Sequence, residues 1–259
     1  VGGIKANNDN PVEFLQENLL IQTNLISAAF TNKILKVLFL GSSCIYPKFS
    51  EQPIKEEYLL NGPLETTNEA YALAKITGIK LCEAYNQKSS INNLEYEFKS
   101  LMPCNLYGVG DNYNYKESHV IPALISKFHK AKILKQPKVN VWGSGVARRE
   151  FLYVDDLAEA SILFLNTSIK EIYKKLPSYK TYINVGSGEE VSIKELSEII
   201  SSIVNYKGDI IFDISQHEGV QRKLLDSTLI KKLNWSHKIN LREGIKLSYN
   251  DYLARVFKS

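Results

Sequence analysis

The chain has 259 residues, of which 44% are hydrophobic and 23% are charged. This balance is typical of a folded globular protein and excludes a disordered one. No run of the sequence approaches the roughly 20 apolar residues that a membrane-spanning helix needs, so we predict no membrane insertion. The formal net charge of +4 does not indicate nucleic-acid binding, and it suits an enzyme with an anionic small substrate equally well.

The first residues and the cysteines indicate whether the chain is part of a longer protein and in which compartment it works. The only methionine is Met102, so residue 1 is not an initiator, and the start lacks the basic and apolar regions of a secretory signal. We therefore expect a portion of a longer protein. The three cysteines Cys44, Cys82 and Cys104 have no metal-ligand spacing, so we predict no metal site and reduced thiols in the cytoplasm.

The first half of the chain alternates helical and strand patterns. Apolar residues at helical spacing predict a helix over residues 11–31. The short apolar run within 36–43 predicts a strand that is buried on both faces of a parallel sheet. A helix over about 68–87 and a polar surface loop over 88–97 follow. Residues 98–108 (FKSLMPCNLYG) are typical of a second buried strand that ends at a glycine.

The second half continues this alternation after an irregular loop over 108–118. His129, His217 and His237 belong to no motif, and we assign them to the surface. The remaining elements are a helix over 119–131, two strands joined by a glycine turn within 138–154, a helix over 156–165, a strand over 181–188, a helix over 192–204 with Ser192 as its N-cap, and a strand over 210–215. Strands that alternate with helices predict the α/β class with a mainly parallel sheet.

Polar residues near the first predicted strand could carry chemistry. Ser42 and Ser43 follow its carboxyl end, which is the edge where open α/β sheets bind ligands. Tyr71 and Lys75 are four residues apart, so they share one face of the next predicted helix. Because an ammonium beside a phenol favours the phenolate, we expect a lowered pKa for Tyr71 and proton transfer near neutral pH. A strand-end serine or a Tyr-Lys helix pair alone also fits a surface without function.

The combination of these residues resembles the extended short-chain dehydrogenase/reductase superfamily, since the tyrosine follows Ser42 by 29 residues. In that superfamily the serine and tyrosine hold a substrate oxygen over a nicotinamide ring, and the lysine grips the nicotinamide ribose. Pro103-x-Asn105 and REFLYVDDLAEA match further segments of it. The resemblance narrows to the GDP-L-fucose synthase family, over almost the whole chain, through the strings GSSCIYP, NEAYALAKITGIKLCEAYN, MPCNLYG, DNYNYKESHVIPALI, VWGSG and RKLLD.

This resemblance implies an N-terminally truncated, Rossmann-like parallel sheet with a smaller C-terminal α/β substrate domain. Residues 1–106, together with 149–188, would form the remaining part of the NADP-binding domain. Residues 107–148 and 189–259 would form the substrate-binding domain.

The glycine-rich phosphate loop of the family has no counterpart in this sequence. Gly143-Ser-Gly145 and Gly186-Ser-Gly188 lack the third glycine that the dinucleotide-binding motif requires. Val1-Gly2-Gly3 matches the stretch after the fourth strand of the family, so we expect the loop to lie upstream. We also expect this portion alone to bind NADPH weakly and to be inactive.

The resemblance implies a two-stage reaction on GDP-4-keto-6-deoxy-D-mannose. The family inverts C3 and C5 and then reduces C4 with NADPH. Both inverted carbons flank the ketone, so each inversion needs a base on one face and an acid on the other. Cys44 and His119 match the family's pair for this step, while Tyr71 and Ser42 would stabilise the oxygen at C4.

The resemblance therefore supplies a full set of expected site residues. The catalytic set is Ser42, Cys44, Tyr71, Lys75 and His119. The cofactor-binding set is Leu40, Gly41, Ser42, Ser43, Lys75, Pro103, Cys104, Asn105, Leu106 and His119, with NADP(H) as the cofactor. The substrate-binding set is Lys127, Trp142, Arg149, Glu218 and Lys223. The family also implies a cytoplasmic homodimer.

Two alternatives compete with this interpretation. One is another nucleotide-sugar epimerase or dehydratase of the superfamily, although Cys44 stands where those enzymes carry a small residue or a glutamate. The other is a non-catalytic fragment that only binds a nucleotide sugar, which the missing glycine loop favours and the intact catalytic set argues against.

Overall fold

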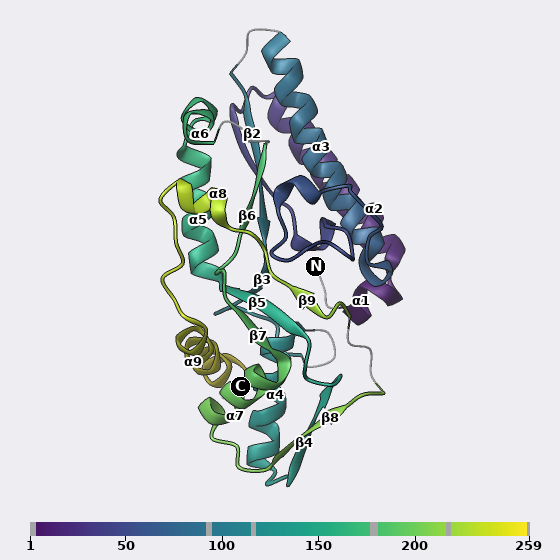
Figure 1. Ribbon diagram of the computed structural model, residues 1–259, viewed down its shortest axis with the longest axis vertical. Coiled ribbons are helices and arrows are strands. Elements are labelled where there is room, and N and C mark those ends of the chain that lie inside the picture. Colours follow the sequence, from purple (N-terminus) through teal and green to yellow (C-terminus); the bar gives the residue numbers. More distant parts are fainter. Residues whose placement is uncertain (1–3, 92–94, 115–117, 177–180, 216–218, 258–259) are drawn as a thin grey trace.

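The structure is a computed structural model that describes residues 4–91, 95–114, 118–176, 181–215 and 219–257. Its described strands form three separate sheets, and the first and the last of these lie at opposite ends of an elongated molecule (Figure 1). None of the helices in these ranges has the length and apolar character needed to cross a membrane.

The first sheet is parallel and lies between two layers of helices (Figure 1). Its strand order is β1 (Lys36–Leu40), β2 (Glu97–Pro103) and β6 (Tyr182–Val185). One layer consists of α2 (Pro11–Thr31) and α3 (Glu69–Ile91), which pack against each other, and α1 (Ile4–Asp9) precedes them. The other layer contains α5 (Val154–Asn166), α6 (Ile169–Lys175) and α8 (Thr228–Lys232). This arrangement confirms the predicted Rossmann-like class.

Strand β1 is less buried than its apolar sequence predicts. Its two end residues are exposed and its three central residues are half-buried, so burial on both faces is wrong. Within the described residues β1 pairs with β2 alone, and Ile34 and Leu35 beside it are each 51% exposed. An apolar run favours a strand, but its burial depends on which neighbours cover it.

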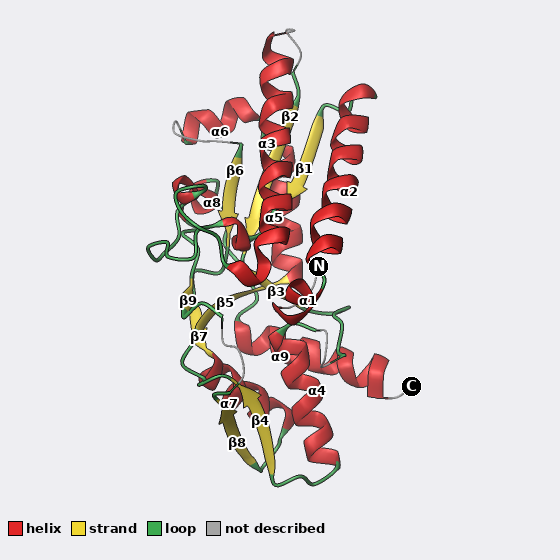
Figure 2. Ribbon diagram, turned by 90° about the vertical axis from the view of Figure 1, so that its right-hand side faces the viewer, coloured by secondary structure: helices red, strands yellow, loops and turns green. Residues whose placement is uncertain are grey.

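The second and third sheets build the other half of the molecule (Figure 2). Strand β5 (Arg148–Tyr153) pairs in parallel with β3 (Asn105–Tyr107) and β9 (Arg222–Lys223), and antiparallel with β7 (Glu190–Ser192). Strands β4 (Lys138–Trp142) and β8 (Asp209–Asp213) form a parallel pair. Helices α4 (Val120–Ile133), α7 (Ile193–Val204) and α9 (Leu241–Tyr252) pack together around a second hydrophobic core.

Several local predictions can be compared with these bounds. The helix over 11–31 is confirmed, and Ser192 caps α7 with a capping box that includes Glu195. The predicted strand over 98–108 is instead two strands, since β2 ends at Pro103 and β3 joins a different sheet. The predicted loop over 88–97 is shorter, because α3 continues to Ile91.

His129 is not a surface residue as predicted. Its side chain is 3% exposed, and its Nδ1 lies 2.9 Å from the Tyr249 hydroxyl on α9. The ring is buried because α4 packs against both α7 and α9. His237 is half-buried, and His217 lies outside the described residues.

Candidate active site

A cavity of about 510 Å³ lies where strands β1 and β2 end at their carboxyl edge. All five residues predicted to be catalytic line it: Ser42, Cys44, Tyr71, Lys75 and His119. So do all ten predicted to bind the cofactor, which add Leu40, Gly41, Ser43, Pro103, Cys104, Asn105 and Leu106. The fold therefore brings both predicted sets together from separate segments of the chain.

The end of β1 fixes Ser42 and Cys44. The Gly41 N–H donates to the Leu101 carbonyl at 2.8 Å, which extends the pairing with β2 by one residue. A Cβ on Gly41 would stand 2.4 Å from the Met102 sulfur, so glycine permits this close approach. The Ser42 hydroxyl then accepts a hydrogen bond from the Cys44 N–H at 3.2 Å and caps the 3₁₀ turn over Ser43–Ile45.

Tyr71 is buried beside this turn, and its hydroxyl hydrogen-bonds with Ser42. The pKa of Tyr71 is raised to about 12. Burial is the largest cause, the Cys44 sulfur acts in the same direction, and the Ser42 hydrogen bond acts in the opposite one. The predicted lowering of this pKa by Lys75 is therefore wrong in this structure. Desolvation of a phenolate in the protein interior outweighs the neighbouring cation.

Lys75 lies close to Tyr71 but points to the end of β1. Its ammonium donates to the Leu40 carbonyl at 3.0 Å and lies 5.7 Å from the centre of the Tyr71 ring. Burial lowers the pKa of Lys75. Because its own pKa is raised to about 12, Tyr71 keeps its proton at neutral pH, which makes it a proton donor and not a base.

His119 stands just before α4 and lines the cavity with its ring exposed. The surrounding protein lowers the pKa of His119, while the Asp111 carboxylate raises it. Because the lowering is the larger effect, the imidazole is neutral at pH 7. Asp111, which no sequence motif marked, lines the same cavity and is part of the turn-rich loop that precedes the histidine.

The predicted substrate residues divide into two groups. Arg149 on β5 and Lys223 on β9 line the cavity, and the Lys223 ammonium lies 3.5 Å from the Cys44 sulfur. Lys127 and Trp142 are not among the lining residues, but they contact each other, with the ammonium 5.5 Å from the indole centre. Glu218 lies outside the described residues.

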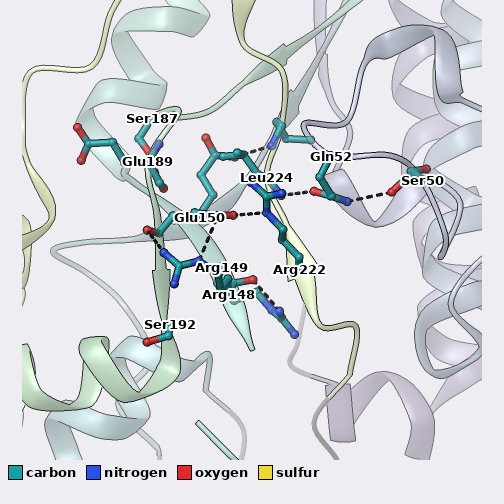
Figure 3. A network of polar contacts seen from close by, with 12 residues as sticks. Ser50, Gln52, Arg148, Arg149, Glu150, Ser187, Glu189, Ser192, Arg222 and Leu224 are labelled. Carbon is teal, nitrogen blue, oxygen red and sulfur yellow. Dashed lines mark hydrogen bonds and ion pairs between the residues drawn. The ribbon is translucent and has the colours of Figure 1, made fainter. Parts of the chain in front are cut away.

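No sequence motif marked the polar network that includes Arg148, Glu150 and Arg222 (Figure 3). Glu190 accepts from Arg148 at 2.9 Å and from Arg222 at 2.7 Å. The buried Glu150 accepts from the Leu225 N–H at 3.0 Å, and burial raises the pKa of Glu150 to about 7. In the sequence Arg148, Glu150 and Arg222 stand next to expected site residues and Glu190 does not, which is too weak a signal to select them.

Comparisons with known proteins show the family to which this chain belongs. Residues 1–175 match the family described as NAD dependent epimerase/dehydratase. The chain is 47% identical over 253 residues to the GDP-L-fucose synthase of Escherichia coli (strain K12), and the match covers 98% of this chain and 77% of that protein.

Solved structures show the same similarity. A GDP-6-OMe-4-keto-L-xylo-heptose reductase from C. jejuni has a TM-score of 0.89 and 35% identity, covering 96% of this chain and 79% of that one. A GDP-L-fucose synthetase from Naegleria fowleri bound to NADP has a TM-score of 0.86 and 28% identity, covering 96% and 75%. The chain belongs to the NAD dependent epimerase/dehydratase family and, within it, to the GDP-L-fucose synthases.

Proposed function

We propose that the protein is a GDP-4-keto-6-deoxy-D-mannose 3,5-epimerase and 4-reductase that forms GDP-L-fucose with NADPH. The observation that carries this proposal is that Cys44 and His119 line the same cavity as Ser42, Tyr71 and Lys75. Reduction of a ketone needs a proton donor such as Tyr71. A thiol and an imidazole are needed in addition only if protons also leave and return at carbon.

The epimerisation uses the acidity of the carbons beside the ketone. When one of their protons is removed, the electron pair moves onto the oxygen at C4. Ser42 and Tyr71, which hydrogen-bond with each other, are suited to donate to that oxygen. Cys44 and His119 come from different segments of the cavity wall, which suits a base and an acid acting on opposite faces of the sugar.

The chain's own residues fit the nicotinamide end of NADP(H), which supplies the hydride when it is bound. Leu40–Ser43 and Pro103–Leu106 line the cavity at the ends of the two neighbouring strands β1 and β2. The close approach at Gly41 keeps this edge free of side-chain bulk. Lys75 presents its ammonium at the end of β1, where it would hold ribose hydroxyls, and Tyr71 would protonate the oxygen at C4.

The substrate nucleotide needs cations and an aromatic surface. We propose that Arg149 binds the pyrophosphate, because this residue lines the cavity and a guanidinium suits a phosphate. Trp142 is 51% exposed and, with Lys127 beside it, offers a stacking surface for the base. Glu218 completes the proposed substrate set. In this proposal residues 107–148 and 189–259 form the substrate-binding domain, and 1–106 with 149–188 form the NADP-binding domain.

We also propose a cytoplasmic homodimer. On α2, Ile21 and Leu25 lie one helical turn apart and are 59% and 66% exposed, and Leu73 on α3 is 44% exposed. Apolar side chains at neighbouring positions favour contact with a second copy. The double variant Ile21→Glu with Leu25→Glu should halve the mass found by sedimentation, and an unchanged mass would contradict this interface. Three free cysteines suit a reducing compartment.

The test of the epimerase function is solvent exchange without reduction. The protein, completed with the expected upstream glycine-loop portion, is incubated with GDP-4-keto-6-deoxy-D-mannose in deuterated water without NADPH. Deuterium at C3 and C5, strongly reduced in Cys44→Ser, is the expected result. Cys82→Ser is the matched control, because Cys82 is buried away from the cavity lining.

Two other outcomes would contradict the proposal. Absence of exchange with folded, substrate-bound protein would exclude epimerisation. If NADPH then still reduced the substrate, a simple GDP-sugar 4-reductase would remain. If substrate bound but neither reaction occurred, a nucleotide-sugar binding protein would remain.

A further inference from the structure

We propose that Lys223 is the positioning residue that keeps the sulfur of Cys44 in its thiolate form for proton transfer at carbon. This inference rests on the proposed epimerase function and adds a residue that controls one step of it. It gives Lys223 a different task from the expected contact with the substrate.

The contact itself joins two distant parts of the chain. The Lys223 ammonium lies 3.5 Å from the Cys44 sulfur, although 179 residues separate them in the sequence. Both side chains are half-buried, so solvent screens their interaction less than it would at an open surface. An ammonium at this distance favours a thiolate over a thiol.

The backbone around Lys223 is held on both sides (Figure 3). Strand β9 pairs with β5, so that Lys223 is opposite Arg149. The Leu224 N–H donates to the Gln52 side-chain carbonyl at 2.8 Å, and the Leu225 N–H donates to Glu150 at 3.0 Å. The Leu224 carbonyl in turn accepts from the Ile54 N–H at 2.8 Å. The ammonium is therefore placed by a fixed main chain and not by a free surface segment.

Other charged groups also face this cavity. Lys48 forms an ion pair with Glu65 at 3.2 Å, and Arg222 forms one with Glu190 at 2.7 Å. The remaining titratable groups that line the cavity are Tyr46, Tyr71, Lys75, Cys104, Tyr107, Asp111, His119 and Arg149. Tyr71 keeps its proton, since burial raises its pKa to about 12. Of these groups, the Lys223 ammonium is the cation that contacts the Cys44 sulfur within the described residues, at 3.5 Å.

The chemical step is balanced without any change in the lysine. The thiolate takes a proton from the carbon next to the ketone, so the C–H bond breaks and an S–H bond forms. The bonding electrons move to the oxygen at C4 and then return to the carbon, which takes a proton on its opposite face from the His119 imidazole N–H. Water restores the proton of His119 and accepts the one held by the Cys44 thiol. Lys223 takes no part in the bond changes, and its charge lowers the free energy of the anionic sulfur before each turnover.

The first experiment measures alkylation of Cys44 by iodoacetamide against pH, resolved by peptide mass spectrometry, without substrate. In Lys223→Met we expect about a tenfold slower reaction at pH 7, with a half-maximal rate at higher pH. Lys223→Arg should restore most of the rate. Should the methionine variant misfold, Lys223→Gln tests the same loss of charge.

The matched control is Arg222→Met, which removes one positive charge from the neighbouring residue. The Arg222 guanidinium contacts Glu190, not the sulfur, so its removal should leave the alkylation profile in place. An equal shift in both variants would contradict the proposal, because any positive charge near the cavity would then have the same effect on Cys44. No shift in Lys223→Met would also overturn the proposal.

The second experiment repeats the exchange assay with Lys223→Met at saturating substrate. We expect about tenfold slower deuterium incorporation at pH 7, and recovery at high pH where the thiol ionises unaided. A loss that saturating substrate removes, with an unchanged pH profile, would show that Lys223 only binds substrate. No exchange in the unaltered protein would contradict the proposed function, and the alkylation profile would still decide the role of Lys223.

Discussion

The cluster around Ser42 and the pair formed by Lys127 and Trp142 were both expected to serve one substrate, yet they are built differently. Tyr71 of the cluster is 8% exposed and its neighbours are fixed by hydrogen bonds to the end of β1. Trp142 is 51% exposed, and its ring lies against the Lys127 ammonium. Burial changes the proton affinity of the first group, whereas the second offers contact area. We therefore expect chemical steps to depend on the cluster and affinity to depend on the pair.

The largest expected effect comes from Tyr71→Phe. Loss of the proton donor should reduce the rate of NADPH-dependent reduction by about 10³-fold with a small change in KM. The free energy of unfolding should change little, because the aromatic ring that packs in the site is retained. NADPH consumption and urea unfolding measure the two quantities. A reduction rate within tenfold of the unaltered protein would exclude Tyr71 as the donor.

The buried carboxyl group of Glu56 should make the stability of the protein depend on pH. Burial raises the pKa of Glu56 from 4.5 to about 7, so the folded state holds a proton that the unfolded state has lost. The free energy of unfolding should therefore fall as pH rises from about 5 to about 7. Glu56→Gln removes the cost of the buried charge and should be more stable than the unaltered protein by about 1–3 kcal/mol at pH 8.

Urea unfolding at pH 5 and pH 8 measures this difference, which should nearly vanish at pH 5. Glu57→Gln is the matched control, because this neighbouring carboxylate is exposed. A Glu56→Gln variant with the same stability difference at both pH values would show that the carboxyl does not titrate in this range.

Trp142→Ala tests the exposed pair. Loss of a stacking surface should raise KM for the GDP-sugar by about five- to tenfold and leave kcat unchanged, since stacking contributes on the order of 1 kcal/mol. Stability should stay the same, because half of the side chain is in solvent. Steady-state kinetics would show the contrast with Tyr71. A fall in kcat with constant KM would remove the distinction between the two regions.

Lys127→Met should have the smallest effect. Its ammonium donates to the Asn140 carbonyl at 3.0 Å and lies over the Trp142 ring, so its main task is to orient that ring. We expect KM to rise about two- to threefold, as for a partly exposed cation–π contact. Lys127→Arg should keep the contact. A larger effect than that of Trp142→Ala would indicate that Lys127 binds the substrate directly.

Local patterns in the sequence were sufficient for much of this structure. Helix 11–31 and the cap at Ser192 follow from interactions within one or two helical turns. The Tyr71–Lys75 pair follows from helical spacing, and Ser42 from its place after an apolar run. The resemblance of short strings to a known family then identified the cofactor class and reaction.

Tertiary structure decided the properties that depend on neighbours distant in sequence. It raised the pKa of Tyr71 where its nearby lysine predicted the reverse, and it buried His129 against Tyr249 and Tyr252 of α9. It also placed the Lys223 ammonium on the Cys44 sulfur across 179 residues. Spacing determines which side chains share a helix face, but burial and long-range contacts set the free energy of a charge, because they depend on the atoms that replace water around it.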